Sequence, residues 1–233
     1  MITDFNVDLI GKEDMFVCCD CMEYMRQMPD RCVDLAIVDP PYGLGVDMQT
    51  KNKGRSVLAT SKEYPTIAGL DNQIPDKLYF DELLRISKKA IIWGGNYFSS
   101  MLPNSSCWIV WNKDNGENDF ADCELAWTSF DKAVRMFTFR WQGMLQGDMK
   151  NKEKRIHVMQ KPVALYEWLL NKYANPGDKI LDTHVGSASS LIACHNTNHR
   201  FIGFELSKEY YRLAKERYEK ETSQMRLTDF LEV

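Results

Sequence analysis

Four short apolar runs of this chain end in an acidic residue, and this repeated ending constrains the fold most strongly. The runs are 15–20, 33–39, 179–182 and 200–205, which end in Asp20, Asp39, Asp182 and Glu205. Runs of this length, rich in Val, Ile, Leu and Phe, are typical of buried strands, and helical patterns lie between them. Strands that alternate with helices predict a parallel sheet, in which ligands bind at the carboxyl ends of the strands. We therefore expect the four acids to border one shared groove.

The length and composition fit one α/β domain covering 1–233. A net charge of −4 argues against a protein that coats nucleic acid nonspecifically, because such binding depends on phosphate neutralisation by Lys and Arg. No stretch approaches the roughly 20 apolar residues of a membrane span, and the first residues do not form a signal peptide. We expect a cytoplasmic protein that has no membrane partner.

The cysteines and histidines do not predict a metal site. Seven cysteines, an odd number, do not indicate a disulfide framework. His195 and His199 stand four residues apart beside Cys194 and could supply zinc ligands, but no second cluster completes a tetrahedral site. No metal cofactor is therefore predicted.

The segment Asp39-Pro40-Pro41-Tyr42 follows the apolar run that ends at Val38. Proline supplies no N–H for a strand ladder, so the two prolines end the strand and stiffen the loop. A carboxylate, the Pro40 carbonyl and an aromatic ring together suit a flat heterocycle that bears an amine. Taken alone, the segment is equally consistent with a stiff turn that has no chemical role.

The small residues at 183–190 follow Asp182 and lead into a helix, so a ligand can approach the backbone closely there. G-x-G-x-x-G and the Walker G-K-[ST] are both absent, which favours a nucleoside cofactor without a pyrophosphate. Glu205, about twenty residues further on, is placed to accept hydrogen bonds from a ribose diol. S-adenosylmethionine meets this description. The residues predicted to bind it are Asp20, Lys161, Asp182, Thr183, Gly186, Ser187, Ser189 and Glu205.

Three motifs occur in a fixed order, namely D-P-P-Y at 39–42, H-V-M-Q-K-P at 157–162 and L-D-T-H-V-G-S-A-S at 181–189. This order resembles the beta group of DNA amino-methyltransferases, in which the catalytic block precedes the cofactor block, and the resemblance spans about 15–218. It implies a Rossmann-like, S-adenosylmethionine-dependent methyltransferase fold with a mostly parallel sheet and helices on both faces. It also implies a restriction–modification role in a bacterial or phage-infected cell.

The resemblance further implies that the exocyclic amine of a flipped DNA base is methylated. Asp39 and the Pro40 carbonyl would accept the amine hydrogens, and Tyr42 would stack on the base. A leading Asp in this motif favours N6 of adenine. The alternatives are an N4-cytosine enzyme, an RNA or protein amide methyltransferase, and a catalytically silent DNA-binding relative.

Two positions depart from the family pattern. Val158 and Met159 stand where H-P-x-Q-K-P is common, and Ala188 stands where a G-S-G turn is common. The alanine adds a methyl group at the point where the cofactor is expected to approach the backbone. We therefore expect Ala188 to act on cofactor affinity.

Strand-like runs at 107–111, 124–130 and 133–139 predict an antiparallel corner of the sheet. The last two runs are separated only by Asp131 and Lys132, which predicts a hairpin.

Two inserted loops, 44–75 and 141–156, are basic and are expected to contact DNA, although a solvated surface loop has the same composition. The short second loop predicts a short target sequence, read with help from the first loop or from the second subunit of a homodimer. The predicted DNA-binding residues are Lys51, Lys53, Arg55, Lys152, Lys154 and Arg155.

Overall fold

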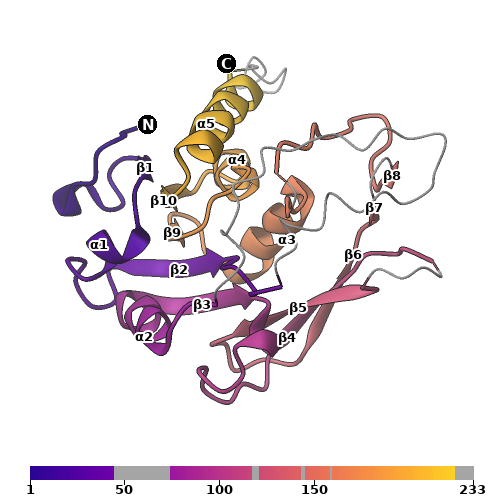
Figure 1. Cartoon of the computed structure of the whole chain (residues 1–233), viewed down its shortest axis with the longest axis horizontal. Helices are drawn as coiled ribbons and strands as arrows, with labels where there is room; N and C mark the ends of the chain where they lie inside the picture. The colour runs from indigo at the N-terminus through magenta and orange to yellow at the C-terminus, as the bar shows by residue number, and fades with distance from the viewer. Residues whose placement is uncertain (45–73, 117–120, 143–144, 158, 224–233) are drawn as a thin grey trace.

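The computed structural model describes residues 1–44, 74–116, 121–142, 145–157 and 159–223 (Figure 1). Helices and strands alternate along most of this chain, as the apolar runs predict. The elements are η1 Val7–Leu9, β1 Met15–Cys18, α1 Cys21–Met25, β2 Val33–Val38, α2 Lys77–Ile86, β3 Ser87–Trp93, η3 Gly95–Tyr97, β4 Trp108–Asn112, β5 Cys123–Thr128, β6 Arg135–Thr138, β7 Trp141–Gln142, β8 Leu145–Gln146, α3 Val163–Tyr173, β9 Lys179–Asp182, α4 Ser189–Asn196, β10 Arg200–Glu205 and α5 Lys208–Thr222.

Among the described residues, eight strands form one sheet in the order β1-β10-β9-β2-β3-β5-β4-β6. The five strands from β1 to β3 pair in parallel, whereas β5 is antiparallel to both of its neighbours, β3 and β4. The expected mostly parallel sheet with an antiparallel corner is therefore confirmed.

The predicted hairpin between the runs 124–130 and 133–139 is wrong. Strand β5 lies between β3 and β4, so both of its edges already carry a partner. Strand β6 instead pairs in parallel with the other edge of β4, with Ile109 opposite Arg135. A two-residue link permits a hairpin, but it cannot provide one when the first strand has no open edge.

The order of the strands explains why the helices cover both faces. The connection through α2 runs from β2 to β3 in one direction along the sheet, and the connection through α4 runs from β9 to β10 in the other. Because parallel crossovers are right-handed, α2 and α4 must lie on opposite faces. Strands β2 and β9 are neighbours, so their carboxyl ends form the topological switch point at which open α/β sheets bind ligands.

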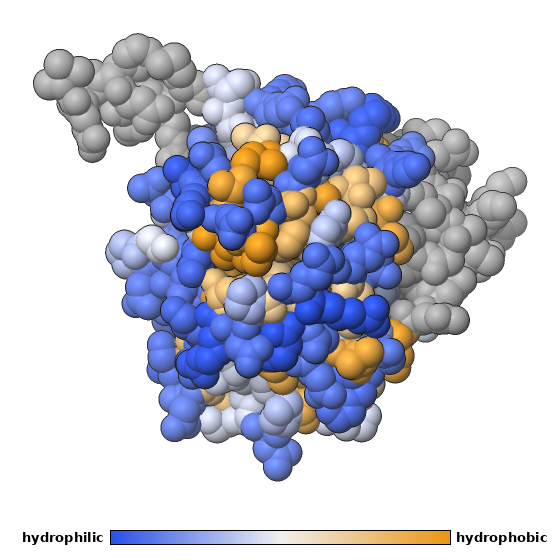
Figure 2. All heavy atoms as spheres, turned by 90° about the vertical axis from the view of Figure 1, so that its left-hand side faces the viewer, coloured by the Kyte–Doolittle hydropathy of each residue, from blue (hydrophilic) through white to orange (hydrophobic). Residues whose placement is uncertain are grey.

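The outer surface is mixed in character. Figure 2 shows the face that carries the N-terminal segment and α1, where apolar residues gather in the middle among hydrophilic ones. No helix in the described part of the chain is long and apolar enough to cross a membrane.

Candidate functional site

A cavity of about 190 Å³ lies at the carboxyl ends of β2 and β9. Its walls come from five segments that are far apart in the sequence, so the fold is needed to assemble them. All three predicted catalytic residues line it, and so do six of the eight residues predicted to bind the cofactor. Those nine residues are Asp20, Asp39, Pro40, Tyr42, Lys161, Thr183, Gly186, Ser187 and Glu205.

Asp39 lies where β2 ends, and its carboxylate has two side-chain partners. Lys161 Nζ lies 2.5 Å from Oδ2, and the Tyr42 hydroxyl donates to Oδ1 at 2.5 Å. Lys161 Nζ also donates to the Tyr42 hydroxyl oxygen at 3.1 Å, and only 2% of the Lys161 side chain is exposed. The H-V-M-Q-K-P segment thus supplies the counterion of Asp39.

Glu124 on β5 extends this contact into a chain of alternating charges. Its Oε2 atom lies 3.0 Å from Lys161 Nζ, and its Oε1 atom lies 2.6 Å from Lys113 Nζ. Buried charges are tolerated when they are paired, so the four side chains stabilise one another. Sequence reasoning did not identify Glu124. The available signal was a single acid inside an otherwise apolar strand, because a buried acid requires a partner.

The charges of Asp39, Lys161 and Glu124 shift one another's pKa values. Burial raises the pKa of Asp39, and the Lys161 ammonium acts against that rise. Burial alone would lower the pKa of Lys161, but the Asp39 and Glu124 carboxylates outweigh it and raise that pKa. Burial likewise opposes ionisation of Glu124, yet the Lys161 and Lys113 ammoniums lower its pKa to about 2. Lys161 therefore stays protonated beside Asp39.

Tyr42 has a covered ring as well as a bonded hydroxyl. It stacks on Tyr97 of η3, with ring centroids 5.1 Å apart and an interplanar angle of 21°. Gly94 makes room for this ring, because a Cβ atom there would lie 2.2 Å from Tyr42 Cε1. Tyr97 is 44% exposed and was not identified from the sequence. The structure therefore presents an aromatic pair beside Asp39.

Asp182 and Ser189 do not line the cavity, although both were predicted to bind the cofactor. The Asp182 carboxylate accepts from the His184 N–H at 3.0 Å and from the Ser190 hydroxyl at 2.5 Å. Its complete burial raises its pKa to about 7. Asp182 therefore stabilises the turn after β9 without lining the cavity.

Ala188 was expected to place its methyl group against the cofactor, and the structure shows a different arrangement. Its side chain is fully buried and does not line the cavity, so its methyl group does not project toward a ligand there. Its backbone instead has φ +64°, a left-handed conformation that glycine adopts freely and alanine does not. The cost of the missing glycine therefore lies in the backbone of the turn.

Two acids on the cavity wall fit a nucleoside with amine and hydroxyl donors. Glu205 accepts from the Gly186 N–H and the Ser207 N–H, both at 2.8 Å, and burial raises its pKa. Asp20 caps α1 by accepting from the Met22 N–H and is otherwise exposed. Carboxylate oxygens have two lone pairs each, so both acids keep acceptor capacity for a ligand.

The predicted DNA-binding residues differ in their exposure. Lys152 and Lys154 are exposed, whereas the Arg155 guanidinium packs 5.2 Å from the centre of the Trp141 ring. Lys51, Lys53 and Arg55 lie outside the described residues, as does most of the 44–75 loop.

The spacing that suggested a zinc site is not accompanied by ligand geometry. His199 contacts the Thr197 hydroxyl and the Asn175 carbonyl, and His195 packs edge-on against Tyr218. The described residues hold no group of three or more His, Cys, Asp or Glu side chains arranged to bind a metal ion.

Known proteins with similar sequences are DNA methyltransferases. The DNA methylase family model matches residues 92–216. The type II methyltransferase M.HpaI of Haemophilus parainfluenzae is 27% identical over 249 residues, covering 90% of this chain and 75% of its own. The type II methyltransferase M.HinfI of Haemophilus influenzae is 24% identical over 247 residues, covering 85% of this chain and 66% of its own.

Solved structures share the fold. The complex of M1.HpyAVI with S-adenosylmethionine aligns with a TM-score of 0.55 and 22% identity, covering 87% of this chain and 98% of that one. The cytosine-N4-specific PvuII DNA methyltransferase aligns with a TM-score of 0.57 and 14% identity, covering 91% and 90%. The arrangement is thus the Rossmann-like methyltransferase fold, and S-adenosylmethionine is the cofactor of the family. Because the family model covers more than half of its length, the chain belongs to the N6/N4 DNA methylase family.

Proposed function

We propose that this chain transfers a methyl group from S-adenosylmethionine to N6 of adenine in DNA. The observation that carries the proposal is the position of Asp39, which directly follows β2 and shares one cavity with the turn after β9 and with Glu205. The proposed acceptor of the amine hydrogens and the proposed binding residues for the nucleoside therefore line the same cavity. The leading Asp of the D-P-P-Y motif favours adenine over cytosine.

Asp39 and the Pro40 carbonyl are the groups proposed to act on the amine. The lone pair of an exocyclic amine is delocalised into its ring, so the amine is a poor nucleophile. Acceptors that bind its hydrogens from one side favour a tetrahedral nitrogen. Lys161 and Tyr42 bind the Asp39 carboxylate and fix its orientation. The carboxylate oxygens retain lone pairs that can accept from an amine N–H.

The chain needs no covalent nucleophile of its own. When bound, S-adenosylmethionine supplies a methyl group that is already activated on a sulfonium. The amine nitrogen gives up one proton as it gains the methyl group, and the Asp39 carboxylate, which lines the cavity, is proposed to receive it. Burial raises the pKa of Asp39, which makes it a better proton acceptor than an exposed carboxylate.

Binding of the target base requires that the base leave the duplex, at a cost of roughly a few kcal/mol. We propose that the base stacks on the Tyr42 ring, which is supported by the Tyr97 ring stacked against it. Stacking on an aromatic side chain is worth about 1–3 kcal/mol per base, enough to offset much of that cost.

Contact with the duplex is assigned to residues 44–75 and 141–156. Lys152 and Lys154 are exposed and are proposed to neutralise phosphates, together with Lys51, Lys53 and Arg55. Arg155, which packs on the Trp141 ring and is half-buried, is proposed to contribute less than the two exposed lysines.

Methyl transfer from labelled S-adenosylmethionine tests the proposal, with separate unmethylated DNA, RNA and protein acceptors and nucleoside mass spectrometry of the products. We expect N6-methyladenine in DNA. N4-methylcytosine would replace the adenine assignment, and label found only in RNA or protein would reject DNA as the substrate. Cofactor binding without any transfer would identify a catalytically silent relative.

A further inference from the structure

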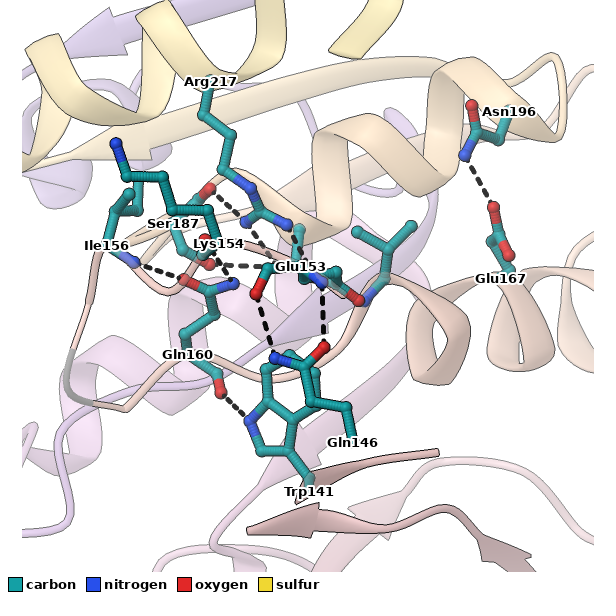
Figure 3. A network of polar contacts seen from close by, with 12 residues as sticks. Trp141, Gln146, Glu153, Lys154, Ile156, Gln160, Glu167, Ser187, Asn196 and Arg217 are labelled. Carbon is teal, nitrogen blue, oxygen red and sulfur yellow. Dashed lines mark hydrogen bonds and ion pairs between the residues drawn. The ribbon is translucent and has the colours of Figure 1, made fainter. Parts of the chain in front are cut away.

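Arg217 on α5 is a buried cation for which the proposed reaction has no direct use. It is only 8% exposed, and its guanidinium is directed at the turn after β9 (Figure 3). One nitrogen donates to the Ser187 carbonyl at 2.8 Å and to the Ser189 hydroxyl at 2.9 Å. The other donates to Glu153 Oε2 at 2.6 Å. An arginine stays charged in such a place, so these contacts are charge-assisted.

The two acceptors on the turn flank Ala188. This residue has φ +64° and is the N-cap of α4, yet it provides no side-chain cap. The left-handed conformation disfavours an alanine relative to glycine by roughly 5- to 30-fold in population. Arg217 bonds the residues immediately before and after it. The arginine therefore supplies, from another helix, a constraint that neither glycine nor a capping side chain supplies here.

The other end of the contact belongs to the second basic loop. Glu153 Oε1 accepts from the Val163 N–H at the start of α3. Its backbone is held by Gln146, whose side chain accepts from the Glu153 N–H at 2.8 Å and donates to the Glu153 carbonyl at 2.9 Å (Figure 3). The exposed Lys152 and Lys154 are its sequence neighbours at ±1. Glu153 therefore connects this loop to Arg217 through direct contacts.

We propose that Arg217 and Glu153 are positioning residues that hold the turn around Ala188 in its cofactor-binding conformation and link it to the loop carrying Lys152 and Lys154. The inference rests on the proposed function. Since coupling between two binding sites is reciprocal, occupation of the loop by DNA and occupation of the turn by the cofactor then change each other's affinity.

The first experiment measures S-adenosylmethionine binding by calorimetry for Arg217→Gln in two backgrounds. With Ala188 present, we expect at least a tenfold loss of affinity. In the Ala188→Gly background the loss should be at most threefold, because glycine adopts this conformation without help. An equal loss in both backgrounds would overturn the assignment. Arg212→Gln is the matched control, since Arg212 is exposed on the same helix and pairs with the exposed Glu216 at i+4.

Thermal unfolding accompanies each variant. If Arg217→Gln does not fold, Arg217→Lys replaces it, because a lysine keeps the charge opposite Glu153 but lacks the fork needed for three acceptors. Its loss of affinity must also shrink in the Ala188→Gly background. If wild-type protein binds no S-adenosylmethionine, the proposed function fails; if it binds and Arg217→Gln is silent, only this inference fails.

The second experiment tests the link to the loop. Glu153→Gln keeps an oxygen for the Val163 N–H and removes the charge that faces Arg217. The affinity for S-adenosylhomocysteine, which has no methyl group to transfer, is measured with and without a duplex that the enzyme methylates. We expect the duplex to change the affinity of wild-type protein at least fivefold and that of Glu153→Gln less than twofold. A wild-type ratio near one, or an unchanged ratio in the variant, would overturn the link.

Discussion

Asp39 and Asp182 end neighbouring strands at the switch point, yet their surroundings differ. Asp39 faces the buried ammonium of Lys161, which comes from the far half of the chain and also pairs with Glu124 of β5. Asp182 accepts hydrogen bonds from the His184 N–H in the turn that follows it and from the Ser190 hydroxyl at the start of α4. Burial raises the pKa of both acids, but for Asp182 only hydrogen bonds oppose it, and its pKa reaches about 7.

This difference indicates that the two aspartates have different roles. A carboxylate with a fixed counterion can accept hydrogen bonds from a ligand amine and receive its proton. A carboxyl group that is surrounded by its own turn can only shape that turn. Substitutions at Asp39, Asp182, Glu124 and Tyr42 test the distinction.

Replacing Asp39 should abolish methyl transfer without loss of the cofactor. Asp39→Ala removes the amine acceptor, and loss of one preorganised polar group typically lowers kcat by roughly 10²–10³-fold. We expect a loss of at least that size in steady-state methylation of DNA. Calorimetry should show S-adenosylmethionine affinity within about threefold of wild type, roughly 0.7 kcal/mol.

Asp34 provides the control for this variant. It lies on the same strand and pairs with Lys88 at 2.6 Å, but it sits at the opposite end of β2 from the cavity. Asp34→Ala should therefore leave kcat within about twofold, roughly 0.4 kcal/mol of activation free energy. Loss of cofactor binding in Asp39→Ala would show that Asp39 belongs to the cofactor wall.

Asp182 should affect the pH dependence of stability. Its pKa is about 7 when folded, against about 3.9 in an unfolded chain. Between these values the folded state retains a proton that the unfolded state has released, so rising pH destabilises the fold. The contribution is absent below pH 4 and complete above pH 7, where it costs about 4 kcal/mol.

Asp182→Asn removes this titration while it can still accept from the His184 N–H and donate to Ser190. Relative to wild type, the free energy of unfolding of the variant should therefore improve by about 4 kcal/mol as pH rises from 4 to 7. Urea unfolding at several pH values measures the difference. Parallel pH curves for the two proteins would refute the role assigned to Asp182.

Glu124 should be needed for stability because it lies between two ammoniums. Glu124→Gln removes the charge that offsets Lys161 and Lys113, and breaking a buried pair costs roughly 3 kcal/mol. Urea unfolding near pH 7 should show this loss. Glu216→Gln, which breaks an exposed pair with Arg212, should change the free energy of unfolding by less than about 1 kcal/mol. Equal losses in the free energy of unfolding for the two variants would mean that the buried ion pairs of Glu124 stabilise the fold no more than an exposed ion pair does.

The sequence allowed prediction of features that depend on local order. Apolar runs ending in acids located strands β1, β2, β9 and β10 and the edge of the sheet where the cavity lies. The small-residue turn could be assigned because its hydrogen bonds run between near neighbours, such as Asp182 and His184. Contacts of this kind can be predicted because both partners lie in the same short stretch of sequence.

Features that depend on distant partners could not be predicted. Lys161 was assigned to the cofactor, yet its ammonium contacts Asp39, which is 122 positions away. A single acid in an apolar strand indicates that Glu124 has a partner, but nothing near Glu124 or Arg217 in the sequence says which residue that partner is. Strand β6 pairs with β4 because β5 has no open edge. In each case the identity of the contact follows from which elements the sheet places together.

Tyr42 offers the smallest and most specific test of the comparison, since its ring and its hydroxyl have separate proposed roles. Tyr42→Phe keeps the ring that stacks on Tyr97 but removes the hydrogen bond to Asp39. A hydrogen bond to a charged group is worth about 1.5–3 kcal/mol in stability, and we expect part of it, near 1.4 kcal/mol, as a tenfold lower kcat. Tyr97→Phe keeps the same stack without touching Asp39 and should leave kcat unchanged. If both variants behaved alike, the hydroxyl would not help to fix Asp39, and Lys161 alone would carry that task.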